Sequence, residues 1–154
     1  MCRRRSSKWG AMNWRCLACL CVVLAAGCSD NTPTSPTETT TTPTAASPTI
    51  TEQFDGVVPV GGSKFYSFTT STYGTINVTL AAVGGAFVPS TVMLRVGLGQ
   101  PSGTDCVTTT SVNTAAGSTV QVTGNFDAAV YCAKVSDIGN LFAPASFSVS
   151  IAYP

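Results

Sequence analysis

Histidine is absent from this sequence of 154 residues, and only 10% of its residues are charged. Acid–base catalysis at neutral pH and metal binding both rely most often on histidine, so its absence argues against the commonest enzyme sites. A serine nucleophile needs a base within reach, and Ser63 beside Lys64 in GGSKF fits the start of a strand better than a serine–lysine pair. These absences predict a protein that is not an enzyme.

The sequence also lacks a hydrophobic run long enough to span a membrane. The N-terminal apolar stretch from Cys16 to Ala26 has about eleven residues, whereas a transmembrane helix needs about twenty. Arginine and lysine residues precede this stretch and small residues follow it, which is the pattern of a secretory signal peptide. We therefore predict a signal peptide over residues 1–27.

The end of this segment, from Leu24 to Cys28 with the sequence LAAGC, resembles the lipobox of bacterial lipoproteins. The resemblance implies that Cys28 becomes the lipid-modified first residue of the mature chain and holds it on the membrane. In such proteins an aspartate after the cysteine retains the protein at the inner membrane. This chain has Ser29 there, so we expect the outer membrane of a bacterial envelope. An ordinary secretory signal cleaved nearby is the alternative.

Beyond residue 27 the chain has no tryptophan and few cations. Its basic residues there are Lys64, Arg95 and Lys134, whereas all 7 acidic residues of the sequence lie in this part. A protein that binds nucleic acid neutralises phosphates with clustered lysine and arginine, so nucleic acid is not an expected partner.

After Cys28 the chain has only two cysteines, Cys106 and Cys132, each within a strand-like run. Two cysteines in an exported domain predict a disulfide. Closing a loop of roughly 27 residues would stabilise the fold by about 3.5 kcal/mol in the chain-entropy model. A metal site is the alternative, but the chain has no histidine and no second cysteine at ligand spacing.

Residues 28–48 are dominated by threonine and proline and have almost no apolar side chains. A segment of this composition cannot bury a core, so it is expected to stay disordered, partly in polyproline II conformation. At about 3.1 Å per residue it could reach about 60 Å. We therefore predict a tether that carries the following domain away from the membrane surface.

The remaining residues, 49–154, alternate apolar and polar side chains between turns rich in glycine and proline. Such alternation buries one face of a strand and exposes the other. About eight strands follow, and they predict an all-β domain, an antiparallel β-sandwich, with a closed barrel as the alternative. The clearest runs are Ile76, Val78 and Leu80; Val92, Leu94, Val96 and Leu98; and Phe147, Val149 and Ile151.

The order of these features resembles the bacterial pre-peptidase C-terminal domains. The resemblance rests on four stretches: Phe54 to Leu80 with its glycines, Leu94 to Gly99, Val130 to Asp137, and Phe147 to Pro154. It implies a jelly-roll-like β-sandwich that accompanies secreted peptidases without doing their chemistry. Some members bind calcium through acidic side chains, for which the candidates here are Asp105, Asp127 and Asp137. Aspartate is also common at turns for its local hydrogen bonding, and no other cofactor is expected.

Three functions remain open for a non-catalytic domain on such a tether. The first is an interaction module for an envelope protein, since sheet edges and loops offer contact surfaces. The second is a carbohydrate- or peptidoglycan-binding module, with Tyr73 and Phe142 as candidate aromatic contacts and Phe87 as a weaker one. Packing in the core or in loops is the alternative for these aromatics. The third is an accessory domain to a separately encoded secreted peptidase. We favour the first.

Overall fold

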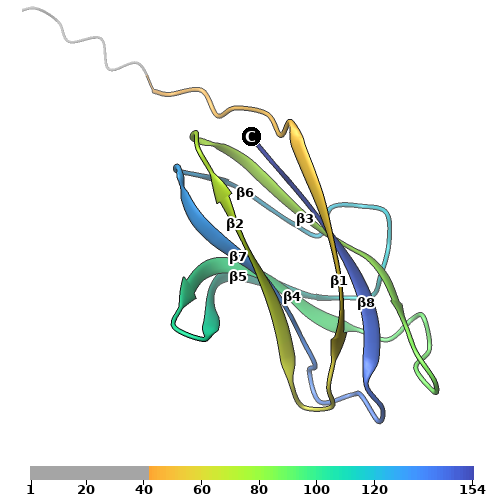
Figure 1. Ribbon diagram of the computed structural model, residues 1–154. Helices are drawn as coiled ribbons and strands as arrows, with labels where there is room; N and C mark the ends of the chain where they lie inside the picture. Colours follow the sequence, from red (N-terminus) through yellow and green to blue (C-terminus); the bar gives the residue numbers. More distant parts are fainter. Residues whose placement is uncertain (1–41) are drawn as a thin grey trace, which may run out of the picture. The chain divides into compact units, whose positions relative to one another are not determined.

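The computed structural model describes residues 42–154, which form an all-β domain (Figure 1). Residues 1–41 lie outside this description, and with them the predicted signal peptide, Cys28 and most of the predicted tether. Within the described range no helix is long and apolar enough to cross a membrane. The strands are β1 (Ile50–Val58), β2 (Ser63–Thr70), β3 (Gly74–Gly84), β4 (Leu94–Ser102), β5 (Asp105–Thr114), β6 (Val122–Phe126), β7 (Ala129–Ser136) and β8 (Ala145–Tyr153).

The eight strands form two separate four-stranded sheets, with the orders β1-β8-β3-β6 and β2-β7-β4-β5. Every pairing between strands is antiparallel. Apart from the β4–β5 hairpin, each connection carries the chain from one sheet to the other, which is the strand order of a jelly roll. The predicted antiparallel, jelly-roll-like β-sandwich is confirmed, and the closed barrel is wrong.

The core lies between the two sheets and consists of the apolar residues that alternate along each strand. Ile76, Val78 and Leu80 of β3 are fully buried, as the sequence pattern predicts. The alternation predicted for β4 starts two residues too early, at Val92, because the strand begins at Leu94. The backbone N–H of Val92 instead donates to the carbonyl of Pro89 in a turn, at an N···O distance of 3.0 Å.

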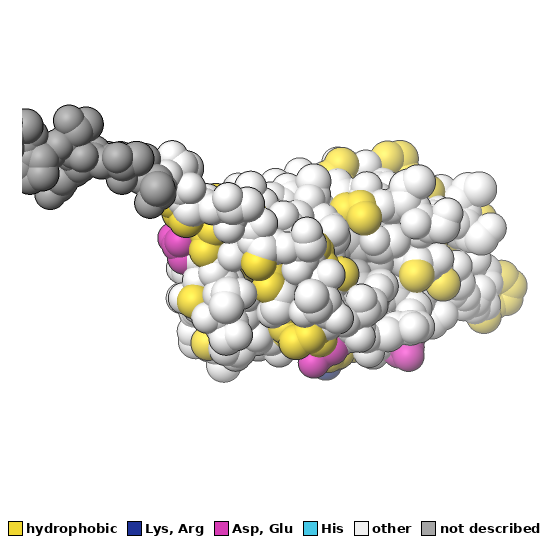
Figure 2. Space-filling view, turned by 90° about the horizontal axis from the view of Figure 1, so that it is seen from above, with side chains coloured by type: hydrophobic (Ala, Val, Ile, Leu, Met, Phe, Trp, Pro, Cys, Tyr) yellow, Lys and Arg dark blue, Asp and Glu magenta, His cyan; other side chains and the backbone are white. Residues whose placement is uncertain are grey.

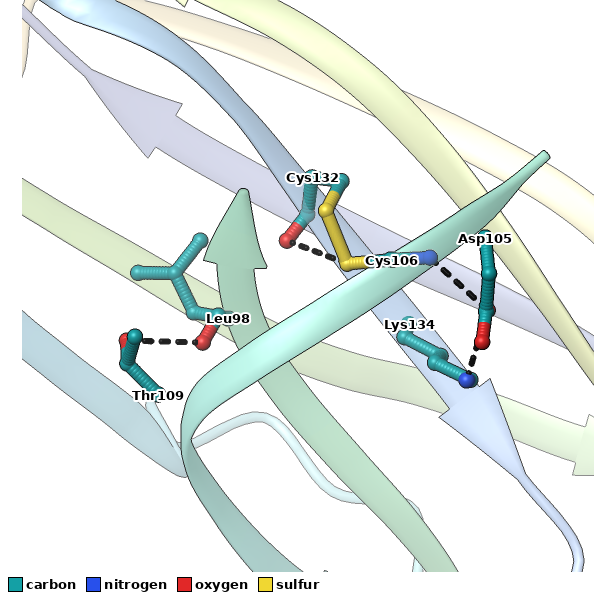
Figure 3. The surroundings of a disulfide bond; sticks show 6 residues. All are labelled: Leu98, Asp105, Cys106, Thr109, Cys132 and Lys134. Carbon is teal, nitrogen blue, oxygen red and sulfur yellow. Dashed lines mark hydrogen bonds and ion pairs between the residues drawn. A yellow bond between two sulfur atoms is a disulfide. The ribbon is translucent and has the colours of Figure 1, made fainter. Parts of the chain in front are cut away.

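The predicted disulfide between Cys106 and Cys132 is present, and it crosses over a strand (Figure 3). Cys106 lies on β5 and Cys132 on β7, and β4 lies between these strands in the sheet. In a flat sheet two strands on either side of a third are about 9.5 Å apart. Here the Cα atoms of the two cysteines are only 6.0 Å apart, so β5 bends over the outer side of β4.

Two glycines of β4 make this bend possible. Gly97 and Gly99 are buried, and a side chain at either would collide with β5. A Cβ atom at Gly99 would lie 1.9 Å from the carbonyl oxygen of Val107, and one at Gly97 would lie 2.6 Å from the Thr108 side chain. The pairing register shifts between Leu98 and Gly99, which marks a β-bulge at the bend.

The described domain has two poles, which we name by the residues at each. At the tether pole, Ile50 pairs with Tyr153, and Ala46 forms a bridge with Gly74. At the distal pole, Val58 pairs with Ala145. Figure 1 shows the chain entering at the upper end, and the connections β1–β2, β3–β4 and β7–β8 at the lower end. The nine residues of β1 span the distance, which at about 3.3 Å per residue is roughly 30 Å.

Candidate functional site

Two phenylalanines at the distal pole point almost entirely into solvent. Phe87, in the β3–β4 connection, is 95% exposed, and Phe142, in the β7–β8 connection, is 98% exposed. Large apolar side chains are normally withdrawn from water, so two on neighbouring loops indicate a contact surface. Together they line a pocket of about 110 Å³, whose other lining residues are Val88, Pro89, Val92, Asn140 and Leu141.

The loop that carries Phe87 holds this residue in an unfavourable backbone conformation. Phe87 has a φ angle of 64°, and it is the one non-glycine residue with positive φ in residues 42–154. The left-handed conformation costs a residue with a side chain about 1–2 kcal/mol. Gly85, two residues before Phe87, also has a positive φ angle, 139°. Its carbonyl accepts a hydrogen bond from the N–H of Val88 at 3.2 Å, which closes the turn around Phe87. The loop thus presents an exposed aromatic ring at a cost in stability.

The loop that carries Phe142 is organised by Asp137. The Oδ1 atom of Asp137 accepts hydrogen bonds from the backbone N–H groups of Gly139 at 2.9 Å, Asn140 at 3.1 Å and Leu141 at 3.3 Å. Its Oδ2 atom accepts one from the N–H of Gly61, in the β1–β2 turn, at 2.8 Å. Asp137 therefore joins two loops of the distal pole and fixes the backbone that leads to Phe142.

These hydrogen bonds also control the ionisation of Asp137. Burial acts to raise the pKa of its carboxyl, but the backbone donors from Gly61, Asn140, Gly139 and Leu141 favour the charged form more strongly. The pKa of Asp137 is therefore lowered from its ordinary value of 3.8. The carboxylate stays charged at neutral pH, and both of its oxygens accept backbone hydrogen bonds.

Asn140 links the two phenylalanine loops and carries an unmet acceptor. Its Nδ2 atom donates to the carbonyl of Met93 at 3.0 Å. Its Oδ1 atom is the buried side-chain polar atom without a hydrogen-bond partner in the described part of the chain. Such an atom costs about 1–3 kcal/mol. One pocket thus combines three energetically unfavourable features: the exposed rings, the left-handed backbone of Phe87 and this unpaired acceptor. Unfavourable local features of this kind concentrate at functional sites.

Tyr73, which we predicted as an aromatic contact together with Phe142, lies at the opposite pole. It is half-buried, and its carbonyl accepts a hydrogen bond from the N–H of Ala46 at 3.1 Å. The structure therefore does not bring Tyr73 and Phe142 together. It pairs Phe142 with Phe87, the residue that the sequence marked as the weaker candidate.

The three aspartates considered for calcium are held apart in separate structural roles. The Oδ1 atom of Asp105 accepts bonds from Lys134 Nζ and from the N–H of Cys106, both at 2.7 Å, and these donors lower the pKa of the Asp105 carboxyl. Asp127 accepts a bond from the Tyr131 hydroxyl through its backbone carbonyl. Asp137 binds the loops described above. Within residues 42–154, no three metal-ligating side chains gather in one place.

The surface of the domain carries little charge. Figure 2, which views the molecule from the tether pole, shows a surface made mostly of backbone and uncharged side chains, with scattered hydrophobic side chains, a few acidic ones and very little basic surface. The ion pair between Lys134 and Asp105 neutralises one of the cations of the domain. No titratable side chain lines the pocket between Phe87 and Phe142. The pocket therefore suits an apolar ligand group.

Comparisons with known proteins identify no family. No protein-family model matches the sequence, and no curated protein matches it. Among solved structures, the chain is similar to the crystal structure of PliG from Aeromonas hydrophila, a periplasmic lysozyme inhibitor of g-type lysozyme. The TM-score is 0.47 and the sequence identity 13%, over 66% of this chain and 84% of that chain. A likeness this distant carries no argument about function.

Proposed function

We propose that this chain is a non-catalytic lipoprotein of the bacterial envelope, and that its β-sandwich binds a protein partner between Phe87 and Phe142. The observation that carries the proposal is the near-complete exposure of both rings on either side of one apolar pocket. Exposed aromatic side chains around a pocket are typical of the residues that dominate binding energy at protein interfaces. Burying each ring would contribute about 1.5–3 kcal/mol.

The position of the pocket supports a partner away from the anchoring membrane. In the proposal, lipid on Cys28 holds the mature chain, and the segment 28–48 leads to the tether pole. Phe87 and Phe142 lie at the other pole, roughly 30 Å away by the length of β1. A site that inserted into the anchoring bilayer would be better placed beside the tether. We propose the outer membrane as the anchoring membrane, because Ser29 stands where an aspartate would retain a lipoprotein at the inner membrane.

The chemistry of the pocket supports binding without catalysis. Its lining consists of apolar side chains and one amide, so it offers no general base and no nucleophile. The resemblance to pre-peptidase C-terminal domains suggests one kind of protein partner, a secreted peptidase that this domain would assist. The jelly-roll order of the sheets is the fold that this resemblance implies.

The experiment is chemical cross-linking of the anchored chain in its native envelope, followed by identification of the captured protein. Phe87→Ala and Phe142→Ala should each abolish capture, whereas Tyr73→Ala, at the tether pole, should leave it unchanged. Cys28→Ser tests the anchor separately, because it should release the chain from the membrane fraction. Retention on peptidoglycan that depends on Phe142, without any captured protein, would replace this proposal by the carbohydrate-binding alternative.

A further inference from the structure

The four sheet edges of the domain differ in how well they are protected from pairing with another chain. An exposed edge strand invites pairing, and proteins guard such edges with charges, short strands or covering side chains. The edges of the first sheet are β1 and β6, and those of the second are β2 and β5. Comparing them shows which edge is left open.

Three of the edges carry a guard. β1 contains Glu52 and Asp55, and β2 contains Lys64. The ring of Phe54 on β1 also stacks on that of Tyr66 on β2, at 4.6 Å between centroids, so these two edges cover each other. β6 has only five residues and includes a glycine, which weakens a strand.

β5 is open over its second half, because the charge of Asp105 and the bulge opposite Leu98 and Gly99 guard its first half, whereas Thr110–Thr114 pairs regularly with β4 and carries neither guard. The strand has ten residues, and from Cys106 to Thr114 it contains no charge and no proline. Every residue from Val107 to Asn113 is exposed, so neither face of the strand is covered by the opposite sheet. Most of these residues are valine or threonine, which favour strand pairing. In the described part of the chain, no strand pairs with the outer edge of β5.

The strand is also held rigidly in place. The disulfide from Cys106 to Cys132 fixes one end of β5, and the ion pair of Asp105 with Lys134, at 2.7 Å, lies beside it (Figure 3). At the other end, Arg95 Nε donates to Asn113 Oδ1 at 3.1 Å. A strand that is already ordered loses little conformational entropy on pairing, which favours association.

We infer that the open edge of β5 binds a second copy of this chain, by antiparallel pairing of the two β5 strands about a two-fold axis. β5 pairs regularly with β4 on both sides of the bulge, over Asp105–Thr108 and over Thr110–Thr114. The second stretch is longer and uncharged, so we place the axis at its centre, Val112. Val112 then lies opposite its own copy, and Ser111 lies opposite Asn113. These pairs are uncharged, so identical strands meet without like-charge repulsion.

The same argument disfavours self-pairing at the other edges. Two copies of β1 would bring their acidic side chains together, and two copies of β2 would bring their lysines together. Pairing through β5 is isologous, so it uses both open edges and stops at a dimer. The pair joins two four-stranded sheets into one of eight strands, and none of the residues that line the pocket between Phe87 and Phe142 belongs to β5.

The test is the mass of the full chain in solution, measured by light scattering over a dilution series. The chain carries Cys28→Ser in every sample to remove the predicted lipidation site. The expected mass is that of two chains, falling to one on dilution. Val112→Lys places two cations opposite each other and should give one chain at all concentrations. Thr123→Lys, on the exposed face of β6, should keep the dimer.

A second measurement locates the contact. In a chain that begins at residue 28, and so lacks the four cysteines of the predicted signal peptide, Val112→Cys should form a covalent dimer on a non-reducing gel, whereas Thr123→Cys should not. A wild-type mass of one chain throughout would overturn the inference, and so would a Val112→Lys variant that remains a dimer. The melting temperature of each variant is the control for folding, and we expect it to stay close to that of the wild-type chain because the substituted side chains are exposed. Phe142→Ala should leave the mass unchanged, so this result is independent of partner binding at the distal pole.

Discussion

Cys106 and Cys132 are bonded across an intervening strand, β4, whose Gly99 is the residue that pairs with Cys132. The bend of β5 that brings their Cα atoms to 6.0 Å depends on the absence of a side chain at Gly99. Gly99→Ala should therefore lower the free energy of unfolding by about 3 kcal/mol, because the new Cβ meets the backbone of Val107. Urea unfolding measures the change. Gly117→Ala is the control, since the nearest atom there lies at 3.8 Å, and an equal loss in both variants would contradict the account.

The disulfide itself should stabilise the domain mainly by restricting the unfolded chain. The two cysteines are 26 residues apart, so replacing both by serine should cost about 3.5 kcal/mol of unfolding free energy. Reduction of the wild-type chain should lower its stability to the same level. A loss below about 1 kcal/mol would mean that the bend of β5 is held by β4 and the Lys134 ion pair without the cross-link.

The pH dependence of stability should carry a contribution from Asp137. Its pKa in the folded chain lies below the ordinary 3.8, so the unfolded chain binds the proton more readily. The stabilisation is complete above the unfolded pKa, and it is lost as the pH falls through the folded pKa. Asp137→Asn removes the charged acceptor of the Gly61 N–H, so wild type should exceed the variant in stability at pH 5–7 and approach it at acidic pH.

The control for that titration is Asp127→Asn, because Asp127 accepts its hydrogen bond from Tyr131 through the backbone carbonyl. Asp105 also has a lowered pKa, but it is present in all three chains and cancels in the differences. A stability difference between wild type and Asp137→Asn that stays constant down to pH 2 would contradict the assigned role.

Phe87 should lower the stability of the domain while it contributes to binding of the partner. Asparagine tolerates the left-handed conformation better than phenylalanine does, so Phe87→Asn should raise the unfolding free energy by about 1 kcal/mol while abolishing partner capture. Phe142→Ala should abolish capture with a change in stability within about 0.5 kcal/mol, because its ring is 98% exposed. A loss of stability in Phe87→Asn would show that the ring supports the fold.

The fold was largely predictable because alternation reports directly on burial. Val149 and Ile151 read as buried in the sequence and are fully buried in the structure. The disulfide followed from counting the cysteines that remain after Cys28. Its path across β4 was not predictable, since it depends on which strand lies between β5 and β7. Gly97 and Gly99 were a signal for that close approach, although glycines also mark turns.

The site was predictable only in part. Phe142 stood out as an aromatic residue in a turn-like segment, but its partner depends on topology. The β3–β4 and β7–β8 connections meet because Gly84 of β3 pairs with Ser146 of β8, a contact between residues far apart in the sequence. The same pairing places Tyr73 at the other pole. Nothing in the local sequence distinguishes these two outcomes.

The most direct test of the central claim is site-specific photo-cross-linking from the distal pole. A photoreactive amino acid replaces Phe142 in the anchored chain, and in a parallel sample it replaces Tyr73. The account predicts one recurrent protein adduct from position 142 in the native envelope, and none of that adduct from position 73. Equal labelling from both positions, or no protein adduct from position 142, would contradict a protein-binding site between Phe87 and Phe142.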